Sequence, residues 1–230
     1  MEKKLTTGSV WKNIVEFSLP YLLSYFLQTL YGMADLFIIG QYEGVAGTTA
    51  VSIGSQVMHM LTVMIVGLAM GTTVSVGQAV GGGDRKKAAG CVGNTAVLFL
   101  GLSVSLTALL LVCTRPIVAV MSTPQAAVEG TVRYLTVCFL GIPFIMAYNV
   151  ISSVFRGMGD SKSPMIFIAV ACAVNIGLDI LFMGLLRLGP AGAALGTTLS
   201  QAVSVAVSFG MMNRQKHGLS LQKDDFRPQK

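Results

Sequence analysis

Residues 14–40 read IVEFSLPYLLSYFLQTLYGMADLFIIG, and only two of these side chains, Glu16 and Asp35, carry a charge. A helix needs about 20 mostly apolar residues to cross a bilayer, so this stretch is long enough to span one. It runs past Asp35 without a small-residue cleavage site, which is unlike a removable signal peptide. The sequence therefore predicts a first transmembrane helix here.

Five more apolar segments follow, at about residues 50–76, 90–112, 132–154, 164–186 and 193–212. The whole chain is 53% hydrophobic and only 11% charged, whereas soluble domains carry about 25% charged residues. No series of alternating ten-residue strands, typical of a membrane β-barrel, occurs. We predict an all-α membrane protein with six transmembrane helices.

The basic residues are divided unevenly between the two sides of these predicted spans. Of the 16 lysine and arginine residues, only Arg115, Arg133 and Arg187 lie on the side away from the termini. Short loops rich in lysine and arginine stay in the cytoplasm. We therefore expect a cytoplasmic N-terminus (1–13), a transmembrane lobe (14–212) and a cytoplasmic tail (213–230). The net charge of +6 is then a signal of topology and not of nucleic-acid binding.

Two carboxylates, Asp35 and Asp179, lie deep inside predicted spans. Placing a charged side chain at the bilayer centre costs at least about 2.5–3.5 kcal/mol. One interpretation is a protonated aspartic acid in an interhelical hydrogen bond, and the other is a binding site for H⁺ or Na⁺. The stretches Gly44–Gln56 and Gly189–Gln201, which follow the two aspartates, share the same spacing of G-x-A-G and a final S-Q. This repeat places both aspartates at equivalent depth, consistent with one shared site.

Polar neighbours of the two aspartates follow the helical period. Gln28, Tyr31 and Asp35 share one face of the first span, and Asn175 lies one turn before Asp179. Thr197 and Gln201 are likewise one turn apart in the last span. Clusters of carboxylate, amide and hydroxyl oxygens suit Na⁺ as well as a proton. The sequence predicts no structural metal and no organic cofactor.

Pro20 lies inside the first predicted helix, where proline removes a backbone hydrogen bond and favours a kink. The kink either couples the helix shape to the charge of Asp35 or is a static feature. On the second span, Ser55, His59 and Thr62 form a looser polar stripe, which we interpret as helix packing.

An enzyme is not indicated by any motif. The four cysteines are scattered through apolar segments without a C-x-x-C pair, and GGGDRKK at 81–87 lacks the spacing of a phosphate-binding loop. We find no nucleophile–base pair in the sequence.

Several motifs together resemble the multidrug and toxic compound extrusion (MATE) family. They are Pro20 fifteen residues before Asp35, GQAVGGGD at 77–84, RGMGDSKSP at 156–164, NIGLD with a later glycine at 175–184, and GPAGAALGT at 189–197. The resemblance implies an antiporter that exports amphipathic, often cationic compounds in exchange for H⁺ or Na⁺. It also implies a location in the inner (plasma) membrane of a prokaryote. It also implies roles for individual residues. Asp35, Asp179, Asn175, Gln28 and Thr197 would bind the coupling cation, while Tyr31, Tyr134, Asn149 and Ser152 would line the substrate cavity.

A MATE transporter has two lobes of six helices, whereas this sequence resembles the first lobe and the start of the linker that follows it. Three explanations stay open: a truncated gene product, one half of a split transporter, or a homodimer. Two other functions also stay open. One is a non-transporting fragment or membrane interaction protein. The other is a lipid-linked oligosaccharide flippase, from which basic residues in the central cavity would be expected, and no predicted helix core contains one.

Overall fold

The computed structural model describes residues 8–214, with side chains to residue 212, and this range folds into helices without strands. The helices are α1 (Val10–Tyr42), α2 (Val45–Gly81), α3 (Arg85–Val120), η1 (Gln125–Ala127), α4 (Val128–Leu140), α5 (Ile142–Gly157), α6 (Lys162–Asp179), η2 (Ile180–Leu185) and α7 (Pro190–Arg214). Residues 1–7 of the predicted N-terminal segment and 215–230 of the predicted tail lie outside the described residues.

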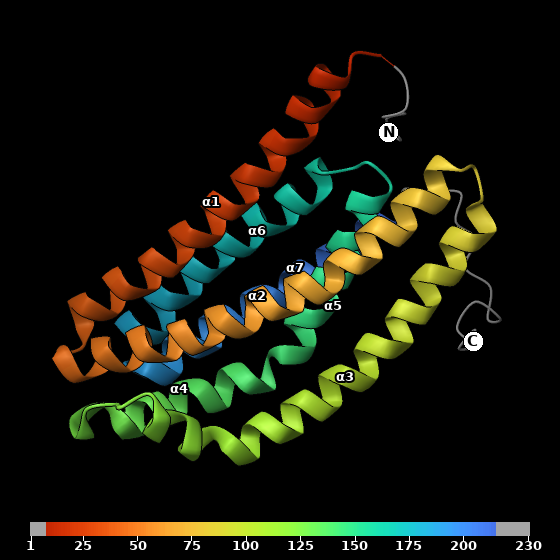
Figure 1. Ribbon diagram of the computed structural model, residues 1–230. Helices are drawn as coiled ribbons and strands as arrows, with labels where there is room; N and C mark the ends of the chain where they lie inside the picture. Colours follow the sequence, from red (N-terminus) through yellow and green to blue (C-terminus); the bar gives the residue numbers. More distant parts are fainter. Residues whose placement is uncertain (1–7, 215–230) are drawn as a thin grey trace.

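The helices run back and forth along one common direction (Figure 1). Five of the described helices are long and apolar enough to cross a membrane, and the bent pair formed by η1–α4 and α5 makes six if it crosses as one span. The prediction of an all-α membrane fold is thus confirmed. The start of α1, the α2–α3 and α5–α6 turns and the end of α7 lie toward one end of the bundle (Figure 1).

The fourth span is not the single helix expected over 132–154. It breaks between α4 and α5, and the two pieces bend by 47°. Pro143, at the start of α5, has no N–H with which to continue the hydrogen bonds of α4. A Cβ at Gly141 would lie 2.8 Å from Thr198 Oγ1 on α7, so the break occurs where the backbone passes close to another helix.

Two other predicted segments have different boundaries. The third span is longer than 90–112, because α3 continues through Pro116 to Val120. The fifth span divides after Asp179, where the α-helix α6 gives way to the π-helix η2. Single π turns inside helices are frequent at functional sites.

The turn between α2 and α3 and the turn between α5 and α6 have the same backbone geometry and the same kind of cap. Gly83 and Gly159 take φ of 76° and 84°, a left-handed conformation that glycine adopts at little cost. The next residue in each turn caps the following helix: Asp84 Oδ1 accepts from Lys87 N at 2.9 Å, and Asp160 Oδ1 accepts from Ser163 N at 3.0 Å. These caps fix the starts of α3 and α6.

Helices α2 and α5 pack closely where Gly157 meets α2. A Cβ at Gly157 would lie 2.8 Å from Val76 Cβ and 2.9 Å from Thr73 O. Gly157→Ala is therefore expected to lower the stability of the lobe by about 1–3 kcal/mol through overpacking. Thermal unfolding in lipid nanodiscs measures this, with Gly71→Ala as the control, because a Cβ at Gly71 meets nothing within 4 Å. Equal melting temperatures for the two variants would contradict the prediction.

Candidate functional site

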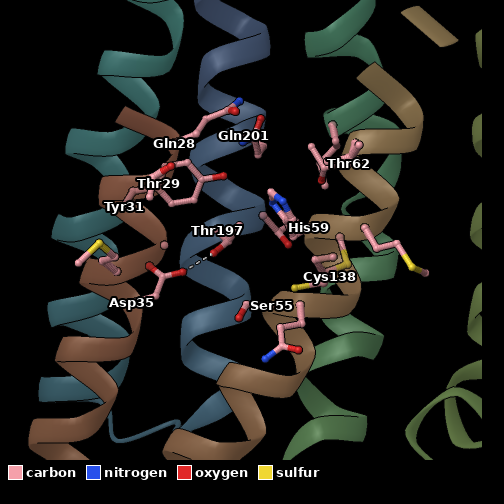
Figure 2. Close-up of a pocket in the computed structure, with 18 of the residues that line it drawn as sticks. Gln28, Thr29, Tyr31, Asp35, Ser55, His59, Thr62, Cys138, Thr197 and Gln201 are labelled. Carbon is pink, nitrogen blue, oxygen red and sulfur yellow. Dashed lines mark hydrogen bonds between the residues drawn. The ribbon is translucent and has the colours of Figure 1, made fainter. Parts of the chain in front are cut away.

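A cavity of about 760 Å³ opens between α1, α2, α4, α5 and α7. Four tyrosines and four methionines contribute to its wall, together with hydroxyl, amide and imidazole side chains. Asp35 is the only carboxylate of the described chain in this wall, and no lysine or arginine belongs to it. Figure 2 shows the polar side chains of α1, α2 and α7 turned toward the same space.

Asp35 lies in the α1 wall of the cavity and is 4% exposed. Its Oδ2 accepts a hydrogen bond of 3.2 Å from Thr197 Oγ1 on α7 (Figure 2). The Thr197 hydroxyl also lies 3.1 Å from Ala193 O, so its single proton is shared between two acceptors. Asp35 Oδ1 has no hydrogen-bond partner among the described residues, which leaves one carboxylate oxygen available to a ligand.

Asp179 faces Asp35 from α6 and is fully buried. The carboxyl groups of Asp35 and Asp179 are close neighbours, and Asn175 lies beside Asp35 as well. Two ionised carboxylates offer only acceptors, so the pair needs a proton or another cation between them. Within residues 8–214, neither oxygen of Asp179 and neither polar atom of the Asn175 amide has a hydrogen-bond partner. Such buried atoms are costly unless a ligand satisfies them.

The backbone of α7 packs directly on the Asp179 carboxyl group. A Cβ built on Gly196 would overlap Asp179 Oδ1 and come within 3.3 Å of its Cγ. Gly196 precedes Thr197, so the residue that leaves room for Asp179 adjoins the one that binds Asp35. The structure thus brings Asp35, Asp179, Asn175 and Thr197 into one cluster, which contains four of the five residues predicted to bind the coupling cation. The fifth, Gln28, lies elsewhere in the cavity wall.

The other predicted site residues are distributed unevenly. Gln28, Tyr31, Tyr134 and Asn149 all line the cavity. Ser152 does not; it is fully buried, and its hydroxyl has no hydrogen-bond partner among the described residues.

Helix α1 continues without interruption through Pro20. The hydroxyl of Ser24, one turn further along the helix, donates a hydrogen bond of 2.8 Å to Pro20 O.

Some cavity residues were not singled out as site residues from the sequence. Ser55, His59 and Thr62 of α2 line the cavity, although we interpreted their stripe as packing. The helical spacing of these three residues could have identified them as one polar face directed to the cavity. Tyr148 also lines it but lies in an apolar run that gave no signal.

Known membrane transporters resemble this chain in sequence. The profile of the MatE family matches residues 20–181. The probable multidrug resistance protein YpnP of Bacillus subtilis is 35% identical over 214 residues, which cover 93% of this chain and 48% of that protein. The chain spans about half the length of the curated relatives it matches.

Solved structures of transporters also superpose on this chain. A MOP superfamily transporter from Pyrococcus furiosus, described as having a binding pocket of reversed polarity that suggests a different function, superposes with a TM-score of 0.89. It is 28% identical, and the match covers 99% of this chain and 50% of that one. The outward-facing conformation of a multidrug resistance MATE transporter also gives a TM-score of 0.89 at 27% identity, covering 97% and 49%.

Proposed function

The chain belongs to the MatE family of multidrug efflux transporters, and from this premise we propose that it binds amphipathic organic cations and exchanges them for H⁺ or Na⁺. Members of this family are multi-pass membrane transporters and not enzymes. We further propose that residues 14–212 act as one lobe together with a second six-helix lobe.

The chemistry of the cavity wall supports an organic cation as the substrate. Asp35 provides the only carboxylate among the lining residues of the described chain, with no lysine or arginine to oppose a positive charge. Tyrosine rings attract cations through their π faces, and methionines adapt to apolar groups of different shapes. This lining also disfavours a pyrophosphate-linked lipid, which would need basic residues.

The paired carboxyl groups support exchange for a small cation. Asp35 contacts both the cavity and the buried Asp179–Asn175 cluster. A proton or Na⁺ bound between the carboxylates would neutralise Asp35 and weaken its attraction for a drug. Drug and coupling cation would then compete, and each would favour a different state of the lobe.

The distribution of basic residues supports cytoplasmic termini. The turns capped by Asp84 and Asp160 are followed by the basic residues Arg85, Lys86, Lys87 and Lys162. Arg156, just before the second of these turns, stacks 4.6 Å from the centre of the Tyr21 ring. Arg115 and Arg133, at the opposite end, both pair with Glu129, at 3.9 and 3.8 Å.

Asp35→Asn is expected to weaken the binding of a cationic dye by about tenfold or more, because the charge-assisted interaction is worth about 1.5–3 kcal/mol. Fluorescence titration of the chain in nanodiscs measures the dissociation constant. Glu129→Gln makes the same acid-to-amide change at an exposed position and is expected to bind as the wild type does. Unchanged affinity in Asp35→Asn would refute the proposed role of this cavity.

A further inference from the structure

A second polar pair lies one helical turn from the contact between Asp35 and Thr197. Tyr31 precedes Asp35 by four residues on α1, and Gln201 follows Thr197 by four residues on α7. Because α1 and α7 run in opposite directions, the two pairs lie one above the other along the cavity wall (Figure 2). Both Tyr31 and Gln201 line the cavity.

The amide of Gln201 is buried but incompletely satisfied. The residue is 5% exposed, and its side chain lies beside that of Tyr31 (Figure 2). Its Oε1 has no hydrogen-bond partner among the described residues. The amide carbonyl oxygen is thus a buried acceptor without a donor, on a residue of the cavity wall. A buried acceptor without a donor is costly, so a ligand that donates to it gains affinity.

We propose that Gln201 is a specificity-determining residue, and that the cavity prefers protonated amines that bear an N–H group over quaternary ammonium ions. This inference rests on the proposed function and narrows its substrate class. Asp35 attracts both kinds of cation through their charge. Only the protonated amine can also donate a hydrogen bond, either to the Asp35 carboxylate or to the neutral carbonyl oxygen of Gln201. A change at Gln201 removes the second of these contributions and leaves the first.

The physical basis is the asymmetry of hydrogen bonding in a buried site. A site built to bond an N–H group rejects an analogue without that group, because the acceptor then stays unpaired. A preference of about tenfold corresponds to one such hydrogen bond. Adding a methyl group in place of the proton also increases apolar area, which would favour the quaternary ion. A preference for the amine would therefore run against the effect of apolar area and would indicate a hydrogen bond from its N–H group.

The experiment compares two dyes that differ by one methyl group, naphthylmethyl-dimethylammonium and naphthylmethyl-trimethylammonium, at neutral pH, where both are cations. Fluorescence titration measures both dissociation constants for the 230-residue chain in nanodiscs. The wild type is expected to bind the dimethylammonium dye about tenfold more tightly. Gln201→Met, which keeps the side-chain length without the acceptor, is expected to lose most of this preference.

The control is Gln78→Met, the same change at an exposed position of α2 outside the cavity, which is expected to keep the wild-type preference. Binding of the trimethylammonium dye reports that each variant is folded. Equal affinities in the wild type, as when water satisfies Gln201, would overturn the inference and leave the proposed function intact. A preference retained in full in Gln201→Met would also overturn it. Failure of the wild type to bind either dye would instead refute the proposed function.

Discussion

Asp35→Asn combined with Asp179→Asn is expected to abolish the competition between drug and coupling cation. In the wild type, exchange of one proton for one drug would change the drug dissociation constant by up to about tenfold for each tenfold change in proton concentration. The two asparagines keep the shape of the side chains but cannot take up a proton or balance the charge of Na⁺. The dependence of drug affinity on proton or sodium concentration should therefore fall to zero.

Titrations of a cationic dye over a range of pH and, separately, of sodium concentration at fixed pH measure this dependence. His59 also lines the cavity, so the double variant is best made with His59→Gln present, which removes the imidazole from the cavity wall. Asp84→Asn, in the α2–α3 turn, is the control and is expected to preserve the competition. Fusion to a second six-helix lobe allows the same variants to be tested for gradient-driven efflux. If the double variant still showed competition or coupled efflux, the carboxylate pair would not be the coupling site.

Gly196→Ala is expected to separate Asp179 from Asp35 and to eliminate coupling although both carboxylates remain. The added methyl group would occupy the place of Asp179 Oδ1, and Asp179 is fully buried, so the carboxyl group must move away from α7. Overpacking of this kind costs about 1–3 kcal/mol of stability. Drug binding at Asp35 should persist, but its sensitivity to H⁺ or Na⁺ should be lost.

Thermal unfolding and the same titrations measure both effects. Gly177→Ala is the matched control on α6, because a Cβ there meets nothing within 4 Å, and alanine is the better helix former. Adding Asp179→Ser to Gly196→Ala shortens the clashing side chain and is expected to restore stability without coupling. A Gly196→Ala variant as stable and as strongly coupled as Gly177→Ala would show that α7 does not position Asp179.

The differences between the predicted and observed spans have physical causes. Hydropathy reports the composition of a segment and not the continuity of its hydrogen bonds, so it could not reveal the break at Gly141 or the π-helix after Asp179. Pro143 was a local signal for the break. No local signal marked the π-helix.

The sequence by itself determined that this chain resides in a membrane as helices, since long apolar segments in lipid must satisfy their backbone groups internally. It also determined that Asp35 and Asp179 are buried, and its motifs pointed to the family. Only the tertiary structure decided which helical faces meet. The helical period places residues on one face but does not choose the helix opposite. The packing of α1 and α7 against α6 joins Asp35, Thr197 and Asp179 and leaves Gln201 with a free acceptor, whereas Ser152 lies outside the cavity.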